Sequence, residues 1–114
     1  MSGELWRSWV LDMLAAIDAA SEFVAGMTEE SFRADAKTVS AVTMQLVIIG
    51  EAASQMPDAF RDAHPDIPWR AIRGARNKAV HQYWGTDAGV LWLTITQSLP
   101  ALRATLDAAL EEAR

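Results

Sequence analysis

The 114-residue chain contains no cysteine. This absence excludes a disulfide scaffold, a thiol nucleophile and a thiolate metal site. Histidine is also scarce, because only His64 and His81 are present, and neither belongs to a His-Glu-x-x-His metal motif. The sequence therefore predicts no metal site and no bound cofactor, and it argues against a metal-dependent enzyme.

Long apolar runs are absent as well. No stretch approaches the roughly 20 apolar residues that a membrane helix needs, and residues 1–9 carry Glu4 and Arg7 within an amphipathic pattern that differs from a signal peptide. We therefore expect a cytoplasmic protein that does not bind membranes. Hydrophobic residues make up 51% of the chain and charged residues 22%, which excludes a disordered tail and favours one domain over residues 1–114.

Positive charge is in short supply overall but is concentrated in one place. The chain has 10 Lys and Arg against 15 Asp and Glu, a formal net charge of −5. Residues 61–81 nevertheless contain five basic and two acidic residues, so this segment carries +3 and the rest of the chain −8. Because affinity for phosphates comes from clustered Lys and Arg, only this segment is a candidate for binding nucleic acid.

The apolar residues recur three and four positions apart, and no strand pattern or repeat is present, so we predict helices throughout. The expected helices cover residues 4–24, 34–56, 68–84 and 87 onward, with a short turn of helix capped by Thr28. Residues 57–68, which hold three prolines, are expected to be the least regular part. Thr86 or Asp87 can cap the last helix, and Pro100 should kink or interrupt it near Ser98. The predicted fold class is an all-α bundle of four main helices with one or two short ones.

The helix expected over residues 34–56 is apolar on more than one face. Val42, Leu46 and Ile49 form one stripe, whereas Met44 and Ile48 lie elsewhere on the helical wheel. Such a helix either lies at the centre of a bundle or is covered by a second subunit.

The third helix carries the candidate chemistry. Arg76 shares a face with apolar and aromatic residues, namely Trp69, Ile72, Ala79, Val80 and Tyr83. A guanidinium on such a stripe is costly unless it is paired or lines a cleft. A planar guanidinium binds phosphate oxygens, and an imidazole with a pKa near ~6.5 can take a proton from a ribose 2′-hydroxyl and return one to the leaving group without a metal. However, Arg76 and His81 are about 140° apart on an ideal helix, so either the helix is distorted near His81 or a second copy completes the site.

These residues resemble the signature of a known family. The segment from Arg76 to Tyr83 has the form Arg-x4-His-x-Tyr, which is similar to the motif of HEPN-domain toxins of the HepT type, from HEPN–MNT toxin–antitoxin systems. Two more blocks are similar to the same family and extend the resemblance over most of the chain: Ile48-Ile49-Gly50-Glu51-Ala52-Ala53, and His64-Pro65-Asp66-Ile67-Pro68-Trp69 with the following Arg73-Gly74-Ala75-Arg76-Asn77.

The resemblance implies a four-to-five-helix up-down HEPN bundle that dimerises through its motif helix. It also implies a metal-independent endoribonuclease in which Arg76 and His81 are the catalytic pair and Asn77 orients the phosphate or His81. Tyr83 would be the residue to which a cognate nucleotidyltransferase antitoxin transfers AMP, which silences the toxin. The expected partners are a second copy of the chain, that antitoxin and an RNA substrate.

Each of these residues also has a plainer interpretation. Arg76 can form a structural ion pair with Glu51, and in this interpretation Glu51 only positions the arginine without taking part in the chemistry. Arg70, Arg73 and Lys78 either contact RNA or form a solvated face. At the level of function, two alternatives stay open: a non-catalytic helical module that docks a nucleotidyltransferase, and a nucleotide-binding sensor, which ranks last because the chain has no Gly-rich phosphate loop.

Overall fold

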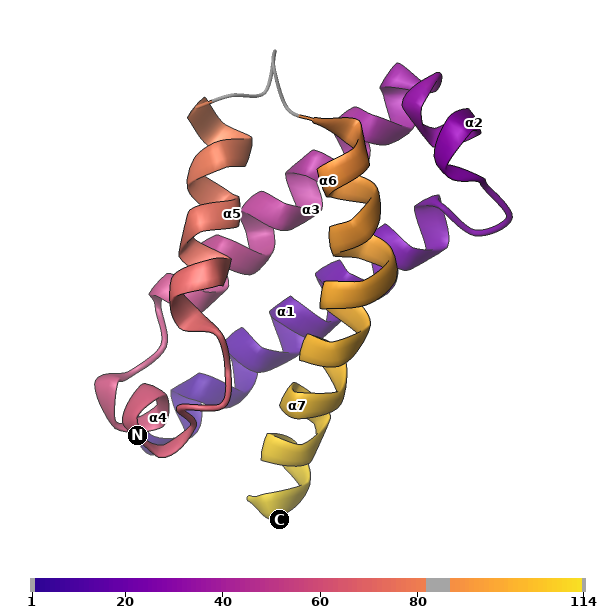
Figure 1. Ribbon diagram of the computed structural model, residues 1–114. Coiled ribbons are helices and arrows are strands. Elements are labelled where there is room, and N and C mark those ends of the chain that lie inside the picture. The colour runs from indigo at the N-terminus through magenta and orange to yellow at the C-terminus, as the bar shows by residue number, and fades with distance from the viewer. Residues whose placement is uncertain (1, 82–86, 114) are drawn as a thin grey trace.

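The computed structural model describes residues 2–81 and 87–113, in which all regular structure is helical. Figure 1 shows the long helices packed side by side, with the last helical segments joined into one rod, so the predicted all-α class is confirmed. The elements are α1 (Ser2–Phe23), α2 (Glu29–Arg33), α3 (Ala36–Ser54), α4 (Asp58–Ala63), α5 (Trp69–His81), and the rod formed by α6 (Ala88–Leu93), η1 (Thr94–Ser98) and α7 (Leu99–Glu112). Helix α4 lies in the segment that was expected to be irregular, where it buries Phe60.

Side-chain caps determine where several helices begin. The Thr28 hydroxyl accepts a hydrogen bond from the Ser31 amide and completes a capping box at α2, as predicted. Asp35 caps α3 by accepting from the Thr38 amide and hydroxyl, and these bonds lower the pKa of its carboxyl. Asp87 caps α6 through the Gly89 amide, which confirms one of the two predicted caps; Thr86 lies outside the described residues.

The last rod changes its winding just before Pro100. Residues Thr94–Ser98 form a π-helical turn, and the amide of Leu99 donates to the carbonyl of Thr94, five residues back. Pro100 follows within the first turn of α7, where its missing N–H removes one backbone hydrogen bond. The predicted interruption near Ser98 is therefore confirmed, while the rod stays continuous in space (Figure 1).

The core lies where α1, α3 and the last rod pack together. It contains the predicted apolar stripes, including the fully buried Val10, Met13, Val42, Ile95 and Leu106. Two large apolar residues at helical spacing are nevertheless exposed, Leu5 at 51% and Val80 at 38%. Helical periodicity alone does not reveal which apolar positions other helices cover.

An ion pair on the surface joins α1 to α7. Arg103 of α7 donates from Nε and Nη2 to the two carboxylate oxygens of Asp18 in α1, at 2.7 and 3.0 Å. This bidentate contact lowers the pKa of the Asp18 carboxyl.

One side of α3 carries exposed apolar side chains. Met44 is 55% exposed and Ile48 is 37% exposed, although both are large and apolar. The described helices therefore do not enclose α3 on all sides.

Helices α3 and α5 approach each other closely at Gly50. A Cβ atom built on Gly50 would lie 2.2 Å from Cβ and 2.4 Å from Cγ of Arg76. Real Cβ atoms do not tolerate such distances, so only glycine allows this helix crossing. The next residue of α3, Glu51, is thereby brought beside Arg76.

We predict that Gly50→Ala destabilises the fold by about 1–3 kcal/mol, because the added methyl group forces α5 away from α3. The matched control is Gly74→Ala, since a Cβ on Gly74 meets no atom within 4 Å and alanine is the better helix former by about 1 kcal/mol. Urea unfolding of both variants measures the difference. If Gly50→Ala proves as stable as Gly74→Ala, the close crossing is refuted.

Candidate functional site

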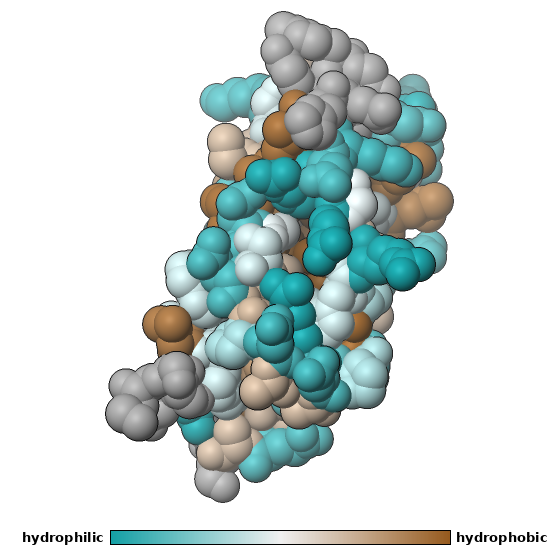
Figure 2. Space-filling view, turned by 90° about the vertical axis from the view of Figure 1, so that its left-hand side faces the viewer, coloured by the Kyte–Doolittle hydropathy of each residue, from teal (hydrophilic) through white to brown (hydrophobic). Residues whose placement is uncertain are grey.

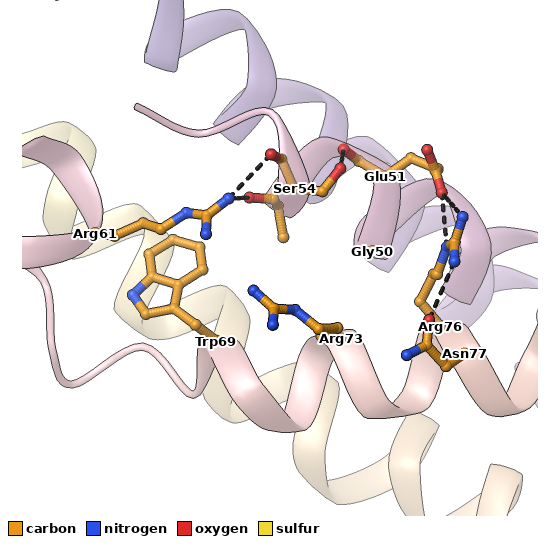
Figure 3. Close-up of a pocket in the computed structure, with 9 residues that line it drawn as sticks. Gly50, Glu51, Ser54, Arg61, Trp69, Arg73, Arg76 and Asn77 are labelled. Atoms are coloured by element: carbon orange, nitrogen blue, oxygen red, sulfur yellow. Dashed lines mark hydrogen bonds and ion pairs between the residues drawn. The ribbon is translucent and has the colours of Figure 1, made fainter. Parts of the chain in front are cut away.

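A cavity of about 260 Å³ opens where α3, α4 and α5 meet. Figure 3 shows its polar side chains converging from the three helices. The lining residues are Gly50, Glu51, Ala53, Ser54, Arg61, Trp69, Arg73, Arg76 and Asn77. The face of the molecule that carries α5 is mainly hydrophilic across its middle (Figure 2).

Arg76 is held in one orientation by two neighbours. Its Nε lies 2.7 Å and its Nη2 2.5 Å from Oε1 of Glu51, and its Nη1 donates to Oδ1 of Asn77 at 3.0 Å. A guanidinium has five N–H groups, so one N–H on each terminal nitrogen is left for a further acceptor. The ion pair with Glu51 that the sequence suggested is therefore present, and it fixes the direction of the arginine fork.

The ion pair contributes more to orientation than to stability. The side chain of Arg76 is 34% exposed and that of Glu51 is 51% exposed. Ion pairs at this level of exposure stabilise a fold by about 1 kcal/mol or less, because water screens both charges. Glu51 and Asn77 are better explained as groups that position the Arg76 guanidinium.

Arg61 and Trp69 also line the cavity, although neither was predicted as a site residue. Arg61 donates from Nη2 to the carbonyls of Ala53 and Ser54, at 3.2 and 2.9 Å, and so satisfies carbonyls at the end of α3. Its guanidinium carbon lies 5.9 Å from the ring centre of Trp69. Arg61 belongs to the basic segment 61–81, which the sequence marked as the candidate for binding nucleic acid. The position of Arg61 at the cavity depends on α4, a helix that was not predicted.

Arg73 differs from the other two arginines of the cavity. It makes no hydrogen bond and no ion pair with any residue in the described part of the chain, and in Figure 3 it lies between Trp69 and Arg76. All three basic residues Arg70, Arg73 and Lys78 are exposed, but Arg70 and Lys78 do not line the cavity. Of the three residues predicted as possible RNA contacts, the structure therefore brings only Arg73 to the site.

The remaining site predictions concern the end of α5. His81 is the last residue of this helix, and its side chain lies outside the described part of the structure. Tyr83 also lies outside the described residues. The catalytic role of His81 and the modification of Tyr83 thus stay predictions.

The charges of the cavity suit an anionic ligand. Three guanidinium groups face one carboxylate, and phosphate accepts the planar, charged donors of arginine well. Within residues 2–81 and 87–113, no group of three or more His, Asp or Glu side chains is arranged to hold a metal ion. None of the helices in these ranges has both the length and the apolar character of a membrane span.

Comparisons with known proteins point to one family. A family profile described as HepT-like, "Ribonuclease HepT-like", matches residues 13–109. A relative in Thermococcus cleftensis, named as a probable ribonuclease HepT, is 38% identical over 101 residues, which cover 89% of this chain and 92% of the relative.

Two other relatives carry names that assign them provisionally as RNases. One, in Caldanaerobacter subterraneus, is 32% identical over 93% of this chain and 95% of its own length. Another, in Methanocaldococcus jannaschii, is 31% identical over 82% of this chain and 78% of its own length. No solved structure was found to match. The family profile and these relatives together show that the chain belongs to the HepT-like ribonuclease family.

Proposed function

We propose that this ribonuclease is the toxin of a toxin–antitoxin pair and that it cleaves RNA internally without a metal ion. The observation that carries the proposal is the arrangement of Arg76, whose guanidinium is fixed by Glu51 and Asn77 at a cavity rich in arginine and keeps donors free on both terminal nitrogens. A group held in this way can bind the scissile phosphate and stabilise the charge that develops on it.

The proposed reaction uses the RNA's own 2′-hydroxyl as the nucleophile. The imidazole of His81 takes the proton of that hydroxyl, and the 2′-oxygen attacks the adjacent phosphorus. A bond forms between the 2′-oxygen and phosphorus, while the bond from phosphorus to the 5′-oxygen of the next nucleotide breaks. The leaving 5′-oxygen receives a proton from the imidazolium, and the other product ends in a 2′,3′-cyclic phosphate. Arg76 neutralises the phosphoryl oxygens throughout.

Two copies of the chain are proposed to form the complete site. Because α5 is α-helical from Trp69 to His81, residues five apart project about 140° away from each other. One α5 therefore does not direct Arg76 and His81 to the same point, whereas two facing helices can. The exposed apolar side chains of Met44, Ile48 and Val80 on α3 and α5 offer surface for such a dimer.

Control by a nucleotidyltransferase antitoxin completes the proposal. Tyr83 follows His81 by two residues, so AMP attached to its hydroxyl would place a bulky anionic phosphate next to the proposed catalytic helix. That phosphate would compete with RNA for the same basic segment. The support for this step is the Arg-x4-His-x-Tyr motif together with membership of the family.

We predict that Arg76→Ala and His81→Ala each lower RNA cleavage by about 100-fold or more, as expected when a phosphate clamp or a general acid–base is removed. The assay uses purified protein, single-stranded RNA and a chelator, and intact mass must show that the wild type lacks AMP. Arg70→Ala is the control, because it removes the same charge from the same helix outside the cavity. Full activity of folded His81→Ala would refute the mechanism, and inactive, unmodified wild type would favour the non-catalytic docking module instead.

Co-expression with a cognate nucleotidyltransferase should add the mass of adenylate to the chain and abolish RNA cleavage. The chain contains a single tyrosine, so any tyrosine adduct identifies Tyr83 without ambiguity. We predict that Tyr83→Phe gains no adenylate and stays toxic in the presence of the partner. An adduct of the same size on Tyr83→Phe would show that another residue is the acceptor.

A further inference from the structure

We propose that the cavity beside Arg76 binds a second phosphate of the RNA strand, one that neighbours the scissile phosphate, and that Arg73 is its main ligand. This inference rests on the proposed function, because it adds a subsite to the same RNA-binding site. The proposal gives Arg73 a role that Arg70 and Lys78 of the same helix do not have.

The partners of the three cavity arginines single out Arg73. Arg61 is engaged by the carbonyls at the end of α3, and Arg76 is engaged by Glu51 and Asn77. Arg73 has no acceptor among the described residues, although it lies between two other guanidinium groups that repel it (Figure 3). A bound anion would supply the acceptor that the protein does not provide.

The spacing along α5 suits neighbouring phosphates. Arg73 and Arg76 are three residues apart, so they share a helical face with about 4.5 Å of rise between them. Both line the same cavity; Arg76 is fixed by Glu51 and Asn77, while the long side chain of Arg73 has no partner among the described residues. A strand that places one phosphate on Arg76 can then bring a neighbouring phosphate within reach of Arg73.

The rest of the cavity wall favours a phosphate over a nucleobase. Gly50 adds no side chain to the wall, and the guanidinium of Arg61 already lies near the ring of Trp69. The cavity holds about 260 Å³, far more than the roughly 30 Å³ that one water occupies. The hydroxyl of Ser54 is already bonded to the carbonyl of Glu51. Arginine N–H groups are thus the main donors that a ligand would meet.

The decisive experiment compares short substrates that differ by one phosphate. The minimal substrate is a dinucleoside monophosphate, which has only the scissile phosphate. The extended substrates carry one additional phosphate at the 5′ end or at the 3′ end. The proteins are wild type, Arg73→Gln and the control Arg70→Gln, which removes an identical charge from the same helix without touching the cavity.

We predict that the additional phosphate, at one of the two ends, raises kcat/KM of the wild type by about 10-fold to 100-fold, the range for a charge-assisted contact. For Arg73→Gln, the ratio of kcat/KM for the extended substrate to that for the minimal substrate should fall close to one, whereas Arg70→Gln should keep the wild-type ratio. The subsite would be overturned if both variants lost the same part of the gain in kcat/KM. It would also be overturned if Arg73→Gln lowered kcat/KM by the same factor on the minimal and the extended substrates.

A binding measurement separates failure of the subsite from failure of the proposed function. If the wild type cleaves none of these substrates, the extended ones are titrated against the tryptophan fluorescence of the same three proteins, because Trp69 lines the cavity. If Arg73→Gln binds the extended substrate about 10-fold more weakly than Arg70→Gln does, the result supports the subsite even without cleavage. Equal affinities, or no binding, would refute it.

Discussion

The contact of Glu51 with Arg76 joins the two helices on which the candidate site is built. It exists because Gly50 lets α5 approach α3 so closely that a methyl group would not fit between them. At this crossing Nε of Arg76 lies 2.7 Å from Oε1 of Glu51, and Asn77 holds the other side of the guanidinium. The pair is too exposed to add much stability. Its consequence is a cation with a fixed direction and two free donors at the edge of a cavity.

The distribution of charge extends this local arrangement to the whole molecule. Residues 61–81 carry a net +3 on a chain whose remainder carries −8, and folding gathers Arg61, Arg73 and Arg76 of this segment around one cavity. A local positive region on an acidic body attracts a phosphate to one place, while the acidic remainder repels nucleic acid elsewhere. This pattern suits an enzyme that must engage RNA at its active site and not coat it.

Much of the fold follows from local signals in the sequence. The apolar stripes of α1, α3 and the last rod, the Thr28 cap and the interruption before Pro100 depend on neighbours within one or two helical turns, so they were predictable. The exposure of Leu5 and Val80 was not predictable, because periodicity shows which side of a helix is apolar but not which apolar positions another helix covers.

The sequence suggested the pair of Glu51 and Arg76, because each is a charged residue among apolar residues of its helix. The structure adds the close helix crossing at Gly50, which brings the two side chains together. The cavity itself required tertiary information, since Arg61 reaches it only through α4 and only the packing separates Arg73 from Arg70 and Lys78.

The positioning role of Glu51 is tested most directly by comparing RNA cleavage by Glu51→Gln and Glu51→Ala. Glutamine keeps an oxygen that can accept from Nε of Arg76, whereas alanine removes it. We predict that Glu51→Ala lowers kcat/KM by about 10-fold to 100-fold, as expected when a catalytic group is displaced by about 1 Å, and that Glu51→Gln restores most of this loss, while urea unfolding shows both variants within about 1 kcal/mol of the wild type. Unchanged or increased cleavage by Glu51→Ala would contradict the account, because it would mean that Glu51 does not orient Arg76 for the reaction.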